Sequence, residues 1–285
     1  MVLEHEIPQG SNLYFGESAK IKREIENLAA QTFLEEGFEE IVTPTFSYIQ
    51  HQDAELNDRE LLRLSNEHNL TIVLRNDSTL DVVRIITKRL GRSTDHKKWF
   101  YVQPVFSYPT SETNQIGAEF LDSTDLKGMC SLLIEFFAKL DLAPYLQLSN
   151  IEIPLRVSKE CGIELEDIKL HKMDALLSKE IGWLTSLLYV KNQSDLQRVI
   201  KELPEFLQEP SSKLLELSSE LGYKNTIISP LFYAPMKYYS DLFFRMFSDN
   251  TVLAQGGKYS SEDIISSGFA IYSDGLIEKL PKDLS

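Results

Sequence analysis

The clearest pattern along the chain is the helical spacing of apolar positions in residues 18–36. One helix face would collect these apolar side chains, so the spacing predicts an amphipathic helix. Ser18 is available as its N-cap, and Gly37 is placed to end it. Similar spacing predicts a helix capped by Asp77 or its neighbour and another over residues 124–140.

Segments rich in β-branched and aromatic residues lie between these helices. Residues 38–44 form a short β-prone run that stops at a proline, and residues 71–75 form another. Residues 99–107 and 115–121 are predicted to form an antiparallel pair, joined by a turn-prone segment of residues 108–114. Since strands and helices do not alternate strictly, we expect an α+β fold with an antiparallel sheet flanked by helices.

The pattern changes near residue 157. Helical spacing with glycine and proline breaks dominates from there to residue 225, and β-prone runs return afterwards. We therefore expect a core made of residues 1–157 and 226–285, with a helical insert over residues 158–225. Within the second part of the core, residues 248–250 are expected to form the turn of a hairpin, followed by one more strand and a final helix.

Composition and charge narrow the classes of function. The 285 residues are 42% hydrophobic and 25% charged, which is typical of a globular protein. A net charge of -14 repels phosphate backbones, so tRNA is not expected as a partner. No export signal or long apolar stretch is visible, so we expect a cytoplasmic protein without a membrane partner. Lone cysteines, scattered histidines and missing nucleotide-loop motifs predict neither a metal nor a cofactor.

The remaining candidates for chemistry are polar residues within apolar strands, where an unpaired polar group would be costly. Alternation places Gln115 and Glu119 on one face of their strand. Residues 74–79 lie at a strand-to-helix junction, where an ordinary N-cap cluster is an equally good interpretation. Phenols and glycines near the C-terminus would complete a pocket for a small molecule with an ammonium group. The candidate residues are Asp77, Thr79, Gln115, Glu119, Tyr238, Tyr239, Gly256 and Gly257.

The order of these segments resembles the catalytic core of the class II aminoacyl-tRNA synthetases, and specifically that of histidyl-tRNA synthetase. Residues 37–44 resemble the dimerisation motif of that class, residues 74–79 its LRPEGT segment, residues 99–107 and 115–119 the two strands of the second class motif, residues 234–241 the RGLDYYTG element, residues 254–259 the AxGGRYD element and residues 267–276 the third class motif. The resemblance implies that residues 115–119 are similar to the HQxGxE element that holds the amino acid.

Three cations of that family are missing from the chain. Ser107 stands where the second motif has an ATP-binding arginine, Ala234 stands at the histidine-specific arginine, and residues 272–276 lack the arginine of the third motif. Removing one preorganised donor typically costs about 3 kcal/mol of transition-state stabilisation. We therefore expect no adenylate formation and no catalytic residue. Because the sequence ends at Ser285, no anticodon-binding domain is expected either.

A synthetase-like chain without these arginines resembles the ATP phosphoribosyltransferase regulatory subunit family, whose LRxDxT variant matches residues 74–79. This resemblance implies a non-catalytic homodimer that joins the short-form catalytic subunit at the first step of histidine biosynthesis. It also implies feedback inhibition through bound L-histidine, which must prefer one assembly state over another. Lys237 stands where the family has an anion. The ammonium group would then be held by Asp77 and Glu119 alone, or the ligand differs, or the chain is a scaffold with an empty site.

Two other functions stay open from the sequence. The first is a ligase that joins an amino acid to an acceptor other than tRNA, which the missing arginines disfavour. The second is an orphan synthetase-like interaction module that has no link to phosphoribosyl transfer.

Overall fold

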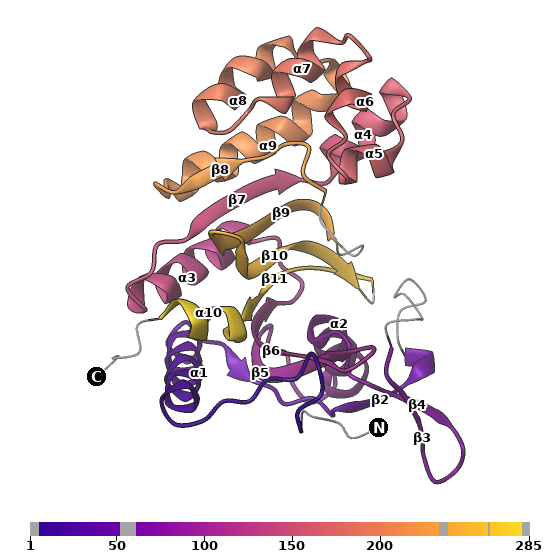
Figure 1. Ribbon diagram of the computed structural model, residues 1–285, viewed down its shortest axis with the longest axis vertical. Coiled ribbons are helices and arrows are strands. Elements are labelled where there is room, and N and C mark those ends of the chain that lie inside the picture. Colours follow the sequence, from indigo (N-terminus) through magenta and orange to yellow (C-terminus); the bar gives the residue numbers. More distant parts are fainter. Residues whose placement is uncertain (1–5, 52–60, 234–238, 262, 281–285) are drawn as a thin grey trace. The chain divides into compact units, whose positions relative to one another are not determined.

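The computed structural model describes residues 6–51, 61–233, 239–261 and 263–280 (Figure 1). The chain divides into two compact units. The first consists of Met1–Leu121 and Ala270–Ser285, and the second of Asp122–Phe269.

The first helix confirms the helical pattern, with a different cap. Helix α1 spans Glu17–Glu35 and buries apolar residues along one face. Its N-cap is Gly16, two residues before the predicted cap Ser18. The Ser18 hydroxyl donates to the Phe15 carbonyl at 3.0 Å instead of capping the helix. Gly37 follows the helix with a φ of +79°, in the left-handed region that favours glycine.

The first unit contains a mixed sheet. Strand β1 (Glu39–Glu40) pairs in parallel with β5 (Lys98–Ser107), which forms an antiparallel hairpin with β6 (Ser111–Phe120). The connection between β5 and β6 is shorter than the predicted segment of residues 108–114. Polar residues 111–114 continue the strand because each pairs with a residue of β5, as Asn114 does with Pro104.

Three short strands and two helices complete this unit. Strands β2 (Phe46–Tyr48), β3 (Arg63–Ser65) and β4 (Thr71–Leu74) form a separate antiparallel sheet in the order β2-β4-β3. A 3-10 turn, η1 (Ile49–His51), follows β2. Helix α2 (Ser78–Ile85) continues into a π-helical turn, η2 (Ile86–Leu90), before Gly91. Helix α10 (Ser273–Lys279) follows the last strand.

The second unit is built on a larger mixed sheet. Its strand order is β11-β10-β9-β7-β8, in which β8 is parallel to β7 and β9 is antiparallel to both β7 and β10. The strands are β7 (Tyr145–Asn150), β8 (Thr226–Ile228), β9 (Tyr239–Ser248), β10 (Thr251–Ser261) and β11 (Ile264–Tyr272). The last three residues of β11 belong to the first unit. Helix α3 spans Leu126–Lys139, close to the predicted residues 124–140.

Only helices are found between β7 and β8, as the sequence pattern indicates. They are α4 (Glu152–Cys161), α5 (Leu165–Lys169), α6 (Met173–Leu177), α7 (Gly182–Leu188), α8 (Gln193–Val199), the 3-10 turn η3 (Ile200–Glu202) and α9 (Glu205–Leu221). These helices belong to the same compact unit as β7 to β10. The expected boundary of an insert at residues 158 and 225 stays a prediction.

Candidate functional site

Two of the candidate residues meet in the first unit. Glu119 on β6 is fully buried, and the Thr79 hydroxyl at the start of α2 donates to its Oε1 at 2.7 Å. The Thr79 and Tyr101 hydroxyl oxygens lie 3.4 Å apart. The strand therefore supplies a carboxylate and the helix a hydroxyl to one buried polar cluster, which we call the Glu119 cluster (Thr79, Tyr101 and Glu119).

Gly117 is the reason that Tyr101 can reach this cluster. The two residues are directly opposite each other in the β5–β6 hairpin. A Cβ atom on Gly117 would lie 2.2 Å from Cζ and 2.3 Å from Oη of Tyr101. The phenol ring thus lies across the partner strand, in space that any side chain would fill. Sequence reasoning missed Tyr101, although an aromatic residue opposite a strand glycine is a recognisable pairing once the register is known.

Asp77 acts as a helix cap. Its Oδ1 accepts the backbone N–H of Leu80 at 3.0 Å, and its side chain is buried. The N-cap interpretation of residues 74–79 is therefore confirmed. A role for Asp77 in ligand binding stays a prediction.

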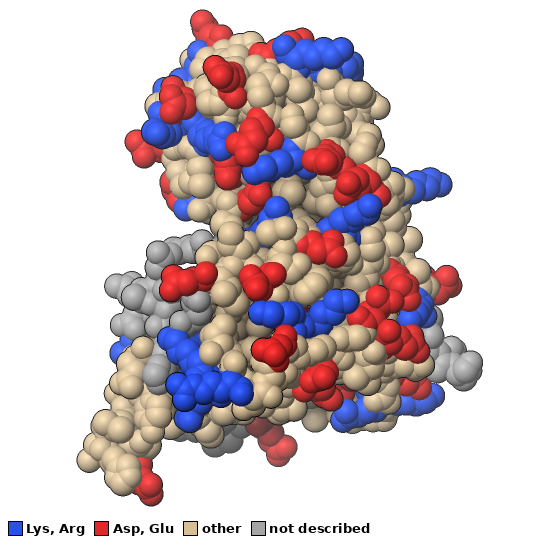
Figure 2. Space-filling view, turned by 180° about the vertical axis from the view of Figure 1, so that it is seen from behind, with Lys and Arg blue, Asp and Glu red and all other residues tan. Residues whose placement is uncertain are grey.

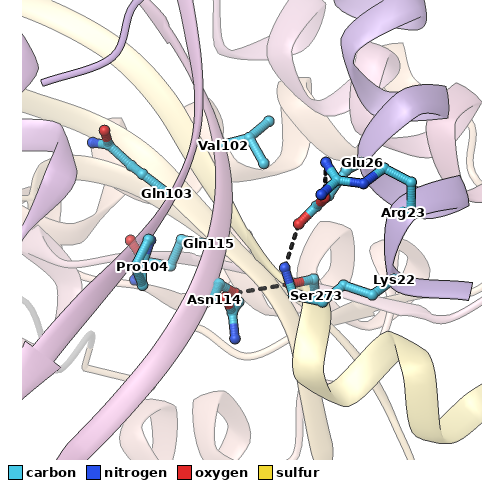
Figure 3. A pocket seen from close by; sticks show the side chains of 9 residues that line it. All are labelled: Lys22, Arg23, Glu26, Val102, Gln103, Pro104, Asn114, Gln115 and Ser273. Atoms are coloured by element: carbon cyan, nitrogen blue, oxygen red, sulfur yellow. Dashed lines mark hydrogen bonds and ion pairs between the residues drawn. The ribbon is translucent and has the colours of Figure 1, made fainter. Parts of the chain in front are cut away.

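Gln115 lies beside a different cavity from the Glu119 cluster. This cavity of about 230 Å³ is lined by Gln115 and Asn114 of β6 together with Lys22 and Glu26 of α1 (Figure 3). Glu26 is buried and forms an ion pair with Lys22. Thr79 and Glu119 do not line this cavity, so the structure does not place Gln115 and Glu119 in one described pocket, although both lie on the same strand.

The segment similar to the third class motif is fixed by the half-buried carboxylate of Asp274. Asp274 accepts hydrogen bonds from the Tyr14 hydroxyl at 2.6 Å, from the Asn114 backbone N–H at 2.9 Å and from the Asn114 side-chain amide at 2.9 Å. Burial, and then the hydrogen bond to Asp274 and its charge, raise the pKa of the Tyr14 phenol above its usual range. Neutral donors thus satisfy this carboxylate without an arginine.

The candidate residues of the second unit pack against their own sheet. Tyr239 is buried and makes an edge contact with Phe243 at a ring distance of 5.0 Å. A Cβ atom on Gly256 would lie 2.4 Å from the Gly268 carbonyl oxygen, and one on Gly257 would lie 2.8 Å from the Leu242 carbonyl oxygen. Close strand packing therefore explains both glycines. Their role at a ligand stays a prediction, and Tyr238 lies outside the described residues.

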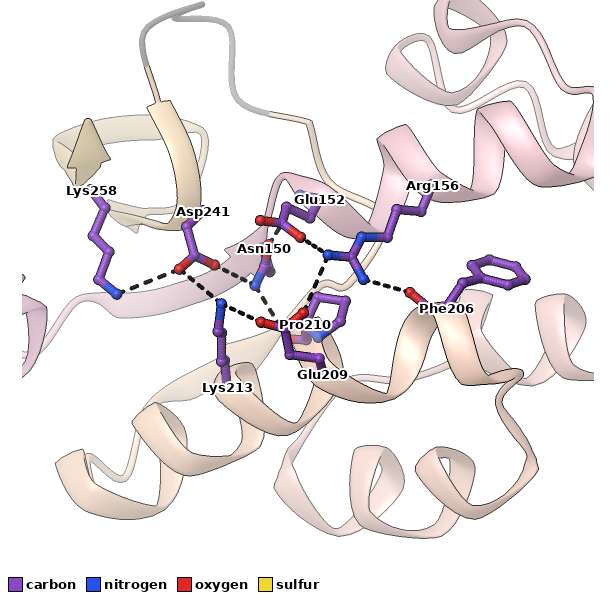
Figure 4. A network of polar contacts seen from close by, with 9 residues as sticks. All are labelled: Asn150, Glu152, Arg156, Phe206, Glu209, Pro210, Lys213, Asp241 and Lys258. Carbon is purple, nitrogen blue, oxygen red and sulfur yellow. Dashed lines mark hydrogen bonds and ion pairs between the residues drawn. The ribbon is translucent and has the colours of Figure 1, made fainter. Parts of the chain in front are cut away.

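A charged network joins Asp241, the last residue of the candidate segment 234–241, to Lys258 of the candidate segment 254–259 (Figure 4). Asp241 on β9 contacts Lys258 on β10 at 3.4 Å, Lys213 on α9 at 3.6 Å and the Asn150 amide at 2.8 Å. The network continues from Lys213 to Glu209 at 2.9 Å and then to Arg156 on α4. Sequence reasoning singled out the two segments but not Asp241. Its place in the sequence, as an acid close after the candidate phenols, is the signal that could have found it.

Two kinds of feature are absent from the described residues. No group of three or more histidine, cysteine or acidic side chains within this part of the chain could hold a metal ion. None of the helices in the described ranges combines the length and the apolar character needed to cross a bilayer.

Comparisons with known proteins agree with this architecture. The family described as histidyl-tRNA synthetase matches residues 14–276. The ATP phosphoribosyltransferase regulatory subunit of Wolinella succinogenes is 52% identical over 98% of this chain and 97% of its own length. The protein of that name from Helicobacter hepaticus is 50% identical over 98% of this chain and 99% of its own.

Solved structures extend the likeness to the fold. A crystal structure described as an ATP phosphoribosyltransferase regulatory subunit/histidyl-tRNA synthetase, from Bacillus halodurans, matches with a TM-score of 0.85 at 17% identity, over 99% of this chain and 84% of that one. Histidyl-tRNA synthetase from a Nostoc species matches with a TM-score of 0.77 at 16% identity, over 98% of this chain and 75% of that one. The predicted α+β, class II synthetase-like fold is confirmed. Because the chain is 50–52% identical over nearly its whole length to two proteins of that name, it belongs to the ATP phosphoribosyltransferase regulatory subunit family.

Proposed function

We propose that the chain is the non-catalytic regulatory subunit of an ATP phosphoribosyltransferase, the first enzyme of histidine biosynthesis. The observation that carries this proposal is the identity of 50–52% over nearly the whole chain to two proteins of that name. The partner is a short-form catalytic subunit, which transfers the phosphoribosyl group and which this chain activates.

The polar groups of the synthetase-like core support a non-catalytic role. A synthetase clamps the triphosphate with cations, whereas this chain has Ser107 in the second motif and no arginine within residues 272–276. The Asp274 carboxylate is bonded to Tyr14 and Asn114. A negative charge at this position repels a phosphate group and does not stabilise one.

The Glu119 cluster is the proposed centre of an amino-acid site. Glu119 is fully buried, and the Thr79 hydroxyl donates to it. A buried carboxylate is stabilised by a close cation with good geometry. The ammonium group of L-histidine supplies such a cation, with Asp77, Gln115, Tyr238, Tyr239, Gly256 and Gly257 as the further residues proposed to contact the ligand. Feedback inhibition then requires that histidine binds more tightly to the inhibited assembly than to the active one.

A homodimer is proposed through residues 37–44. Val42 in this run is 75% exposed although it is apolar, while Phe38 and Ile41 are buried. An exposed β-branched residue beside a short edge strand suits a second copy of the chain. Static light scattering at micromolar concentration should give twice the chain mass of 32.7 kDa. A monomer would contradict this part of the proposal.

Reconstitution tests the main proposal. The chain is mixed with the short-form catalytic subunit from the same genome, and phosphoribosyl transfer is followed with and without L-histidine. We expect one complex on size exclusion, a higher rate than the catalytic subunit alone and a lower rate when histidine is added. Separate elution with an unchanged rate would refute the proposal and favour an orphan interaction module.

The ligase alternative is tested on the same preparation. ATP-pyrophosphate exchange is measured with each of the twenty amino acids. We expect no exchange, because the arginines that would hold the triphosphate are missing. Exchange with any amino acid would support the ligase alternative.

A further inference from the structure

A second cavity of the first unit is not part of the amino-acid site. It has a volume of about 710 Å³ and is lined by residues in and next to β2 and β4 and by residues of α2 and η2. This volume lies within the range of about 300–1,000 Å³ that is typical of small-molecule sites. The candidate residues Asp77, Thr79, Gln115 and Glu119 do not line it.

The helical wall of this cavity is cationic. Arg84, Lys88 and Arg89 line it, and Asp81 is the one carboxylate among its described lining residues. Arg89 is exposed and has no hydrogen bond or ion pair within the described part of the chain. Figure 2 shows basic side chains gathered at the lower left, beside the projecting β3–β4 hairpin. Such a concentration of positive charge is unexpected on a chain with a net charge of -14, and it attracts an anion.

Arg84 gives the cationic wall a fixed group. Its Nη2 donates to Asp81 Oδ1 at 2.7 Å and lies 3.4 Å from the Ser47 hydroxyl. These contacts fix the guanidinium in the wall of the cavity that it lines, and an arginine fork suits a phosphate group.

The strand wall of the cavity is aromatic. Phe46 and Tyr48 line it from β2, and they are 55% and 43% exposed. Residues two apart on a strand lie on the same face. Ring faces of this kind stack on planar bases. Asn66 lines the same space, and its Oδ1 already accepts the backbone N–H groups of His68 and Leu70. Its NH₂ group is therefore the part that can donate to a base.

We propose that this cavity binds a nucleoside phosphate. The phosphate contacts Arg84 and Arg89, with Lys88 beside them, and the base stacks on Phe46 or Tyr48. A cationic wall alone would suit any small anion, and an aromatic wall alone would suit any flat apolar molecule. Their presence in the lining of one cavity selects a ligand that carries both groups. This inference does not depend on the proposed function.

Calorimetric titration of the full-length chain tests the site. The probes are the four ribonucleoside 5′-monophosphates, adenosine and inorganic pyrophosphate, each at 50 mM and 300 mM salt. We expect at least one monophosphate to bind, adenosine to bind at least tenfold more weakly than AMP, and affinity for the phosphate compounds to fall at the higher salt concentration. Absence of heat from every monophosphate at millimolar concentration would overturn the proposal.

Three variants assign the binding to the cavity. Arg89→Gln removes an exposed cation, and we expect a loss of about tenfold or more in affinity for monophosphates and for pyrophosphate. Tyr48→Ala should weaken the monophosphates and leave pyrophosphate unchanged. Arg92→Gln is the matched control, because Arg92 is exposed and does not line the cavity. Binding that is unchanged in both Arg89→Gln and Tyr48→Ala would place the nucleotide elsewhere and refute the assignment.

Discussion

Arg75 offers the sharpest test of how the first unit is held together. It is 2% exposed, and its guanidinium donates to the Thr43 carbonyl at 3.0 Å, to the Pro44 carbonyl at 3.2 Å and to the Pro104 carbonyl from two nitrogens at 2.9 and 2.8 Å. Burial lowers the pKa of this guanidinium from its ordinary value. One side chain therefore joins the residues after β1 to the middle of β5.

The substitution Arg75→Lys keeps the positive charge of the side chain. A lysine ammonium is a single donor atom, so it cannot span the carbonyls of Thr43 and Pro104 as the planar fork does. At least two hydrogen bonds to a charged group are then lost, at about 1.5–3 kcal/mol each. We expect the free energy of unfolding to fall by about 3 kcal/mol or more. At an m-value of about 3 kcal/mol/M, the urea midpoint falls by about 1 M.

The assay is urea denaturation followed by far-UV circular dichroism, with Arg92→Lys as the exposed control. Surface substitutions of this kind usually stay within about 0.5 kcal/mol. A midpoint for Arg75→Lys that equals that of the control would refute the reasoning, because the bridging geometry would then have no energetic value.

Three further predictions concern the site and its surroundings. Glu119→Gln should weaken L-histidine binding at least about tenfold in calorimetry, while Glu112→Gln on the same strand leaves it unchanged; equal affinities would remove Glu119 from the site. Gly117→Ala should destabilise the chain by about 1–3 kcal/mol through overlap with Tyr101, and a smaller loss in the Tyr101→Ala background is the check. Asp241→Asn should lower the free energy of unfolding by about 1–3 kcal/mol, because Lys213 and Lys258 lose their shared carboxylate. Glu220→Gln is the control and should change the free energy of unfolding little, because Glu220 forms only an exposed ion pair with Lys127 at 3.8 Å.

The sequence predicts the fold well where the signal is local. Helix α1 follows from its own apolar spacing, and the Asp77 cap follows from the strand-to-helix junction. Errors arise where several weak preferences compete. Ser18 is a good cap in general, yet the chain begins the helix at Glu17. Residues 111–114 look like a turn because they are polar, but a solvent-accessible strand can be polar while its backbone pairs with β5.

The candidate site is predicted less completely, because no local pattern in the sequence shows which residues meet across strands. Thr79 and Glu119 are 40 residues apart and still meet, which motif order anticipates. Tyr101 was missed because its role depends on the register that sets it opposite Gly117. Gln115 was grouped with Glu119 by alternation, yet it lines another cavity. Side-chain packing decides which cavity a face residue reaches.

The π-helical turn η2 has a consequence for how this chain tolerates changes in length. A π turn closes on one residue more than an α-helical turn, so it takes up an extra residue within nearly the same rotation about the helix axis. Deleting one residue within Ile86–Leu90 would let this turn wind as α-helix and leave the residues after it facing nearly as before. Deleting one residue within Ser78–Ile85 would instead turn the residues that follow by about 100°, and Lys88 and Arg89 would leave the cationic wall of the cavity. In this part of the protein, the place of a deletion therefore decides its effect, even when every arginine and lysine is kept.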